Sequence, residues 1–110
     1  MRLQVISAGR AVAAIAAALS GFFSSAAVCA DADKLRHLLD QDCGSCHGLT
    51  RKGGLGSALT PPALAKFSDD DLVRVIMDGL PGTAMPPWKA IISEQEARAL
   101  VRMLRTEPKP

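Results

Sequence analysis

The sequence has few aromatic residues and no stretch that reads as a β-strand. Its 110 residues include one Trp, three Phe and no Tyr. No run alternates apolar and polar residues as a half-buried strand does, and there is no internal repeat or low-complexity tract. A chain of this length holds one small domain. The composition therefore favours an all-α fold whose core contains little aromatic mass.

The chain also lacks a strong net charge. Lys and Arg number 13 and Asp and Glu 11, giving a formal net charge of +2. Two of the basic residues, Arg2 and Arg10, stand at the extreme N-terminus, and without them the two signs balance. No basic patch with interleaved aromatics is present, so the sequence does not predict nucleic-acid binding.

No hydrophobic run is long enough for a membrane span. The uncharged run from Ala11 to Phe23 is shorter than a spanning helix requires. Preceded by Arg2 and Arg10 and followed by small residues, it is typical of a secretory signal peptide. We therefore expect residues 1–30 to form the signal, with a cut between Ala30 and Asp31, and residues 31–110 to form a mature periplasmic domain without a membrane span.

Cys29 allows an alternative, since a cysteine after such a run can be the lipid-modified first residue of a lipoprotein. Val28 is an unfavourable residue just before a lipidated cysteine. We expect Cys29 to be removed with the signal. The mature domain then contains only Cys43 and Cys46.

A first helix is predicted from about Asp33 to Cys46, with Asp31 or Asp33 capping its start. The residues that follow a helical period in this stretch are Leu35, Leu38, Leu39, Asp42, Cys43 and Cys46. The next segment, residues 48–62, is rich in glycine and has no sustained period, so we expect a loop.

Two further helices are indicated by capping boxes. Ser68 with Asp71, and Ser93 with Glu96, have the spacing at which side chains and backbone N–H groups cap each other. Each pair precedes an apolar face of helical period. We expect the first of these helices to stop at Gly79. The glycines and prolines between the two helices exclude a helix through that segment.

The segment Cys43-Gly44-Ser45-Cys46-His47 carries the clearest chemical signal. It matches C-x-x-C-H, the attachment pattern of a c-type haem. Residues three and four apart share a helix face. Two thiols at this spacing suit thioether bonds to the two vinyl groups of one haem, while the imidazole of His47 reaches the iron from the same side.

Three other uses of these residues are less favoured. A redox C-x-x-C is expected near a βαβ pattern, which this chain does not show. A structural zinc site normally takes four ligands, and beyond the motif the mature domain offers only His37. A disulfide between Cys43 and Cys46 would close too short a loop to add much stability. Haem attachment is favoured over all three.

A second iron ligand is expected from methionine, whose thioether raises the reduction potential in cytochromes c. Met77 and Met103 lie in predicted apolar helices, where methionine usually fills the core. Met85 lies instead in a loop, before Pro86 and Pro87, which restrict its backbone. Met85 is the predicted axial ligand, and His37 is the rival.

With these motifs in place, the mature chain resembles a short bacterial class I cytochrome c. The resemblance is greatest to the cytochrome c55X type associated with haem cd1 nitrite reductase, through the stretches CGSCHGLTRKGGLG and LPGTAMPPW. It implies three to four helices and Gly/Pro-rich loops wrapped round one covalent haem c. It also implies that Leu38 and Leu39 meet the apolar face of the last helix, formed by Leu100, Val101 and Leu104.

The resemblance further implies contacts around the haem. A carbonyl of Pro61 or Pro62 is a candidate partner for the free ring nitrogen of His47, although two prolines can also simply turn the chain. Trp88 is a candidate haem contact. Arg51, Lys52 and Trp88 are candidates to meet the haem propionates, with solvated surface positions as the alternative.

The functional hypothesis is a monomeric one-electron carrier, not an enzyme. The resemblance points to haem cd1 nitrite reductase in denitrification as acceptor, with an upstream cytochrome or membrane donor. A second hypothesis is an accessory factor in haem d1 biosynthesis or nitrite reductase maturation. A third, a five-coordinate haem enzyme or sensor, requires Met85 to be absent from the iron.

Overall fold

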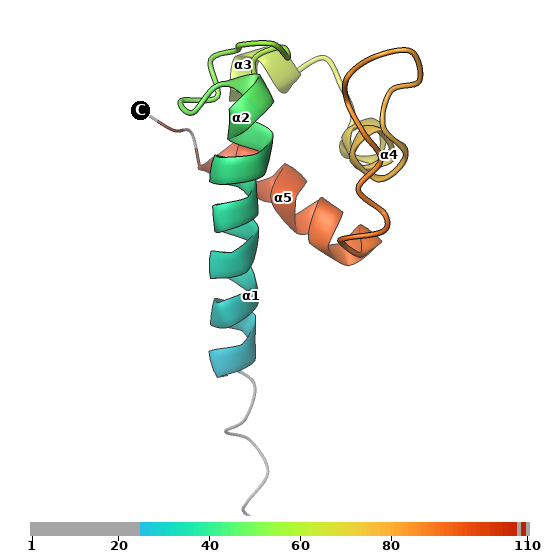
Figure 1. Ribbon diagram of the computed structural model, residues 1–110. Coiled ribbons are helices and arrows are strands. Elements are labelled where there is room, and N and C mark those ends of the chain that lie inside the picture. The colour runs from blue at the N-terminus through green and yellow to red at the C-terminus, as the bar shows by residue number, and fades with distance from the viewer. Residues whose placement is uncertain (1–24, 108, 110) are drawn as a thin grey trace, which may run out of the picture.

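The computed structural model describes residues 25–107 and residue 109. Its elements are α1 (Ser25–Leu38), the π-helical turn η1 (Leu39–Cys43), α2 (Gly44–His47), α3 (Pro61–Leu64), α4 (Asp69–Asp78) and α5 (Glu94–Thr106) (Figure 1). Within these residues there is no β-strand. The predicted all-α fold is confirmed.

The first helix begins earlier than the sequence predicted. α1 starts at Ser25, so Asp31 and Asp33 lie inside it and neither caps its start. The helix continues upstream because residues 25–30 include several alanines and no glycine or proline. The predicted cut between Ala30 and Asp31 falls within α1. The predictions for the signal run in residues 1–24 and for the side chain of Cys29 lie outside the described residues.

The first helix also contains a wider turn that its hydrophobic period does not reveal. The backbone N–H of Gly44 donates to the carbonyl of Leu39, five residues earlier, which defines the π-helical turn η1. Such turns insert one extra residue into an α-helix and are frequent at functional sites. Here the turn ends at Cys43, directly before α2.

Both predicted capping boxes are present. The hydroxyl Oγ of Ser68 accepts from the backbone N of Asp71 at 3.1 Å, and that of Ser93 accepts from the backbone N of Glu96 at 3.2 Å. Each acidic side chain accepts in turn from the backbone N of its serine. α4 ends before Gly79, whose φ of 68° ends the helix at the predicted residue.

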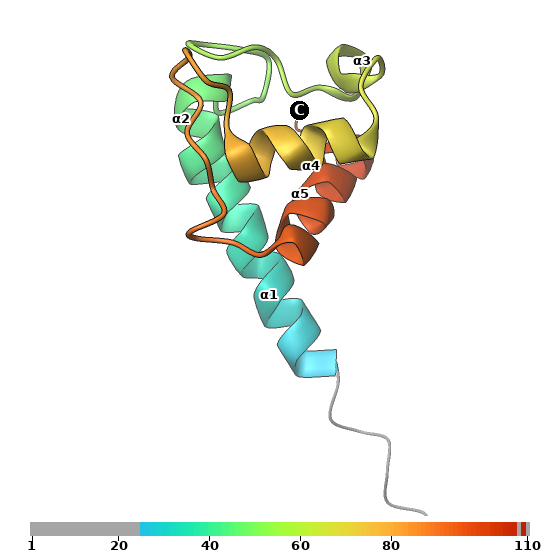
Figure 2. The same cartoon turned by 90° about the vertical axis from the view of Figure 1, so that its right-hand side faces the viewer.

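The core lies where α5 packs against α1, α3 and α4. Figures 1 and 2 show α5 crossing α1 on one side and α4 on the other. The buried apolar residues are Leu35, Leu38, Leu39, Leu64, Val73, Ile92, Ala97, Leu100, Val101 and Leu104. The predicted contact of Leu38 and Leu39 with the last helix is therefore confirmed.

Two long segments without regular helix complete the fold. Residues 48–60 join α2 to α3, and residues 79–93 join α4 to α5. In Figure 2 the second segment leaves the end of α4 and runs on the α2 side of the molecule to the start of α5. Within the described residues, no helix has the length and apolar character needed to cross a membrane.

Candidate functional site

Residues of the C-x-x-C-H motif and of the segment between α4 and α5 line one cavity of about 400 Å³. Cys43 ends η1, and Cys46 and His47 belong to α2. Met85 enters from the segment after α4. The fold thus brings together two parts of the chain that are about forty residues apart, as the motif and the methionine loop predicted.

The cavity wall is almost entirely apolar. Its apolar lining includes Leu38, Leu39, Leu55, Leu59, Leu64, Phe67, Leu72, Val75, Ile76, Leu80, Ala84, Pro86, Trp88, Ile92, Leu100 and Leu104. Two carboxylates, Asp42 and Asp71, also line it, and none of its lining residues is Lys or Arg. A space of a few hundred Å³ with an apolar wall and a few polar groups is typical of a cofactor site.

The two thiols are free, so the disulfide alternative is not what the structure forms. Burial raises the pKa of the Cys43 thiol to about 11, and the negative charge of Asp42 adds to the effect. Reactive redox cysteines have lowered pKa values in electropositive surroundings. A protonated, half-buried Cys43 therefore argues against a redox C-x-x-C, and it is compatible with a thiol that is used once, in thioether formation.

The imidazole of His47 is oriented by a backbone carbonyl. Its Nδ1 lies 2.6 Å from the carbonyl oxygen of Ser57. Because a carbonyl can only accept, Nδ1 carries the proton and Nε2 keeps a free lone pair. That is the tautomer a metal-binding histidine needs.

The predicted partner for His47 was wrong. Pro61 and Pro62 begin α3, where proline suits the first positions of a helix, and the carbonyl comes from Ser57 in the preceding loop. No sequence signal marks Ser57, because a backbone carbonyl is common to every residue type. Gly56 is the nearest clue: a Cβ built there would lie 2.7 Å from the Cε1 atom of His47.

Met85 is held by its own loop and by the end of α4. Its carbonyl accepts from the backbone N of Leu80 at 3.2 Å, and its backbone N donates to Oγ1 of Thr83 at 3.3 Å. Gly79 permits this approach, because a Cβ there would lie 2.7 Å from the Met85 carbonyl oxygen. The side chain of Met85 is half-buried and lines the cavity.

The other predicted candidates lie elsewhere. Met77 and Met103 pack against the hydrophobic core and do not line the cavity. His37 is exposed on α1 and does not line it either. Among the described methionines, only Met85 lines the cavity.

The predicted additional contacts divide into two groups. Trp88 lines the cavity, and its backbone N donates to the carbonyl of Ile76 at the end of α4. Pro62 is exposed and does not line the cavity. Lys52 is exposed outside the cavity, and Arg51 is buried against other partners. The expectation that Arg51 and Lys52 contact propionates is thus not supported by their positions.

These residues fit a covalently attached haem. The cavity presents two thiols, an imidazole with a free Nε2 and a thioether, all within an apolar wall. Thiols for attachment with His and Met for ligation form the donor set of a cytochrome c.

Comparisons with known proteins agree with this reading. Residues 30–104 match the family described as cytochrome c oxidase, cbb3-type, subunit III. The chain is 54% identical to cytochrome c55X of Paracoccus denitrificans over 76 residues, which cover 68% of this chain and 74% of that protein.

Two solved structures are similar. The c-type cytochrome NirC superimposes with a TM-score of 0.70 at 48% identity, over 78% of this chain and 99% of that one. Dihydro-haem d1 dehydrogenase NirN superimposes with a TM-score of 0.62 at 34% identity, over 66% of this chain but 16% of that longer protein. The chain belongs to the family of cytochrome c oxidase cbb3-type subunit III, and it is a short bacterial class I cytochrome c similar to cytochrome c55X.

Proposed function

We propose that this cytochrome is a periplasmic one-electron carrier with one haem c, attached through Cys43 and Cys46 and ligated by His47 and Met85. The observation that carries the proposal is that the motif and Met85 line the same apolar cavity although they come from separate parts of the chain. When bound, the haem supplies a one-electron redox couple whose potential depends on the axial ligands and on the polarity of the surroundings.

Hydrogen bonds within the chain hold the two proposed ligands in place. The Ser57 carbonyl keeps the proton on Nδ1 of His47, so Nε2 stays available. Leu80 and Thr83 hold the backbone of Met85. His47 and Met85 would together hold the iron and would leave no room on it for a substrate, which favours electron transfer over catalysis at the iron. The apolar wall excludes water from most of the site.

The proposed setting is the periplasm. Residues 1–30 have the pattern of a secretory signal, and residues 31–110 form the cytochrome domain. We propose a monomer that meets its redox partners through small, transient contacts, as electron carriers do. The resemblance to cytochrome c55X supports haem cd1 nitrite reductase as the acceptor and an upstream cytochrome or membrane complex as donor.

A role in haem d1 maturation is the second candidate, and the similarity to dihydro-haem d1 dehydrogenase favours it. Deleting the gene in its host and purifying nitrite reductase separates the two roles. If the chain only carries electrons, the reductase keeps its haem d1 and loses electron supply. A reductase purified without haem d1 would instead establish the maturation role.

The ligand assignment is tested by replacing Met85 with alanine. We expect Met85→Ala to lose the weak far-red absorption band of methionine-ligated ferric haem and to have a lower reduction potential, because the thioether favours the reduced state. Met77→Ala and Met103→Ala are matched controls, since both methionines pack on the core outside the cavity.

Three results would contradict the assignment. One is a wild-type protein without the far-red band, and another is a Met85→Ala variant that keeps it. The third is loss of the band in a control variant that is still folded. Rapid carbon monoxide binding to the reduced wild-type protein would indicate a five-coordinate iron and would favour an enzyme or sensor.

A further inference from the structure

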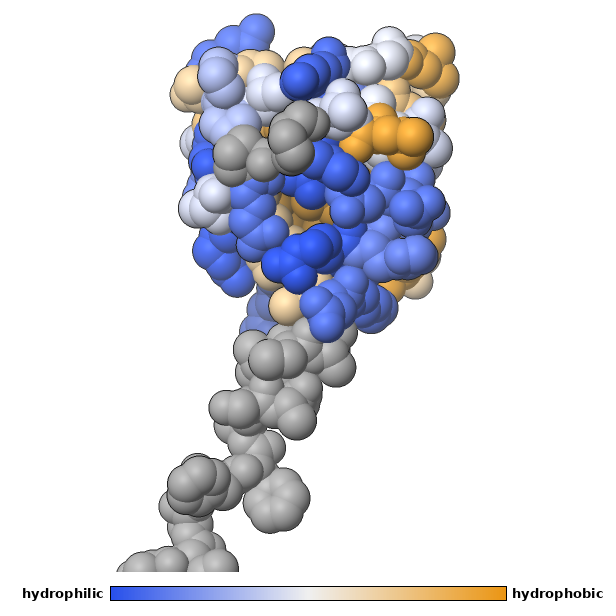
Figure 3. All heavy atoms as spheres, turned by 90° about the vertical axis from the view of Figure 1, so that its left-hand side faces the viewer, coloured by the Kyte–Doolittle hydropathy of each residue, from blue (hydrophilic) through white to orange (hydrophobic). Residues whose placement is uncertain are grey.

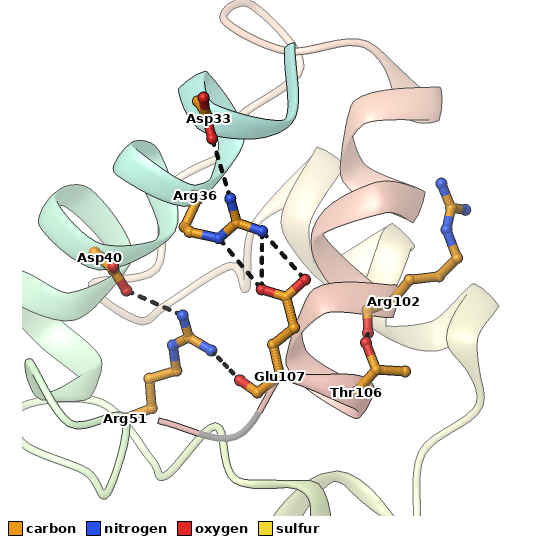
Figure 4. Close-up of polar contacts among 7 residues, drawn as sticks. All are labelled: Asp33, Arg36, Asp40, Arg51, Arg102, Thr106 and Glu107. Carbon is orange, nitrogen blue, oxygen red and sulfur yellow. Dashed lines mark hydrogen bonds and ion pairs between the residues drawn. The ribbon is translucent and has the colours of Figure 1, made fainter. Parts of the chain in front are cut away.

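Arg51 is a buried charged residue in an unusual backbone conformation. Only 6% of its surface is exposed, and its φ of 60° lies in the left-handed region that non-glycine residues avoid. Its Nη1 donates to the carbonyl of Glu107 at 2.8 Å, and its Nη2 to Oδ1 of Asp40 at 3.0 Å. Figure 4 shows the guanidinium between these two partners, which are far apart in the sequence: Asp40 lies in η1 and Glu107 directly follows α5.

Burying a guanidinium and holding its backbone in this region both cost stability. The Nε atom of Arg51 is moreover buried without a partner among the described residues. A glycine would remove the backbone strain, and an exposed side chain would remove the desolvation. Local backbone and solvation preferences therefore do not explain an arginine at position 51. The explanation lies in the two groups that its side chain connects.

The backbone of Arg51 belongs to the loop that orients His47. The Arg51 N–H donates to the carbonyl of Gly48, and the Arg51 carbonyl accepts from Leu59 at 2.9 Å, so residues 52–58 form a loop closed at Arg51. That loop contains Ser57, whose carbonyl lies 2.6 Å from Nδ1 of His47. Two further bonds attach the loop to α2, from Gly53 N to the His47 carbonyl and from Gly56 N to the Cys46 carbonyl.

The side chain of Arg51 attaches this loop to a cluster of charged residues that do not line the cavity. We call Asp33, Arg36, Asp40, Arg51, Glu107 and Lys109 the Arg51 cluster. Its other contacts join Arg36 to Glu107 at 3.2 Å, Arg36 to Asp33 at 3.2 Å and Lys109 to Asp40 at 3.1 Å. Figure 3 shows that the face over α1 and the end of α5 is largely hydrophilic.

Within the cluster, the contact between Arg51 and Asp40 is the sheltered one. Their side chains are 7% and 25% exposed, whereas those of Arg36 and Glu107 are 44% and 45% exposed. Burial opposes ionisation of Asp40, but hydrogen bonds from Arg51 and Lys109 outweigh it and lower the pKa of Asp40. Asp40 is therefore ionised at neutral pH, and it can hold the guanidinium with a charge-assisted bond.

We infer that Arg51 is a positioning residue for the axial ligand: its side chain pins the loop of residues 52–58 to η1 and to the end of α5, and thereby holds the Ser57 carbonyl against His47. This inference rests on the proposed ligation by His47. Arg51 does not line the cavity, so it acts on the site only through the loop. Its effect on the iron passes through the His47–Ser57 hydrogen bond, which sets the orientation and basicity of the imidazole.

The test compares four variants of the haem-loaded protein. Arg51→Gly relieves the backbone strain but removes the side chain, and Arg51→Lys keeps a positive charge with a single donor group. Asp40→Asn keeps an acceptor oxygen without its charge. Lys52→Ala is the matched control, since Lys52 is the exposed neighbour and forms no ion pair or hydrogen bond among the described residues.

Two measurements report on the ligand rather than on stability alone. Exchange of the His47 Nδ1 proton, followed by NMR in the reduced protein, should become about tenfold faster or more in Arg51→Gly because the loop opens more often. The reduction potential should rise, since a weaker bond to Ser57 makes the imidazole a poorer donor to ferric iron. Arg51→Lys and Asp40→Asn should change both quantities in the same direction by less, and Lys52→Ala should change neither.

The outcomes are distinguishable. If Arg51→Gly unfolds more readily but keeps the wild-type exchange rate and potential, Arg51 is only structural and the inference fails. If Arg51→Gly cannot be obtained folded, Asp40→Asn decides by the same two measurements. A wild-type spectrum without histidine–methionine ligation would overturn the proposed function itself, and it is recorded before any variant is compared.

Discussion

At the scale of single residues, glycines decide how closely the backbone approaches the two proposed iron ligands, His47 and Met85. Gly56 lies against the ring of His47, and Gly79 lies against the carbonyl of Met85. The sequence predicted Gly79 as a helix end, but it does not show that Gly56 meets His47 or that Gly79 meets the carbonyl of Met85. Each is needed because any side chain at its position would meet the ligand or the ligand's backbone.

The first residue-scale prediction concerns Gly56. In Gly56→Ala the new Cβ would lie 2.7 Å from Cε1 and 2.8 Å from Nδ1 of His47, so the ring or the loop must move. Overpacking of this kind costs about 1–3 kcal/mol. We expect a lower urea midpoint for loss of the haem spectrum, together with a shifted reduction potential.

Gly44→Ala is the matched control for Gly56→Ala. A Cβ at Gly44 meets only ordinary contacts, the nearest being a side-chain atom of Leu49 at 3.5 Å, and the site is helical. Alanine should be tolerated there, with a gain of up to about 1 kcal/mol from helix propensity. Equal losses in both variants would mean that contact with His47 is not the cause.

At the scale of elements, caps and contacts between helices fix where α4 and α5 begin. Arg105 on α5 donates to Asp69, the first residue of α4, at 2.8 Å, and to the carbonyl of Phe67 at 2.7 Å. Arg98 on α5 donates to Asp70 at 2.8 Å. The acidic first turn of α4 is therefore placed both by the helix dipole and by partners on α5.

The element-scale prediction concerns the cap of α5. Ser93→Ala removes the hydroxyl that accepts from Glu96 and should cost about 1 kcal/mol. In a domain of this size that corresponds to a fall in Tm of about 4–8 °C. Because Asp also caps well, Ser93→Asp should restore most of the loss. A variant without the cap but with unchanged Tm would show that packing alone holds this helix end.

At the scale of the whole molecule, the cofactor site is part of the core. The cavity shares Leu38, Leu39, Leu64, Leu100 and Leu104 with the hydrophobic core. An unfilled space of about 400 Å³ would leave these core residues without packing partners on one side. A small domain has about 5–15 kcal/mol of total stability. The haem is therefore expected to fill the part of the core that the side chains leave open, and the domain is expected to depend on it for folding.

The corresponding prediction is made for a chain that cannot attach haem. Cys43→Ser combined with Cys46→Ser, isolated without haem, should lose most of its cooperative unfolding transition and its dispersed methyl NMR signals. The haem-loaded wild-type protein is the reference. A sharp thermal transition of the unloaded variant would show that the helices are stable without the cofactor.

The sequence by itself determined the parts that depend on local chemistry. The C-x-x-C-H spacing, the methionine before two prolines and the two capping boxes each involve residues within one turn or one short loop. Their meaning is set by covalent geometry and by hydrogen bonds between near neighbours. For the same reason, both ends of α4 were predictable: its start at the cap residue Ser68 and its stop at Gly79.

Only the tertiary structure decided which distant groups meet. The carbonyl that accepts from the ring of His47 belongs to Ser57 and not to Pro61 or Pro62. The side chain of Arg51 binds Asp40 and Glu107 and does not line the cavity. The helical period of the sequence also did not predict the π-helical turn before the motif or the start of α1 at Ser25. These features depend on loop closure and on packing between elements, where a carbonyl or a guanidinium takes whichever partner the fold brings near, and residue type alone does not specify that partner.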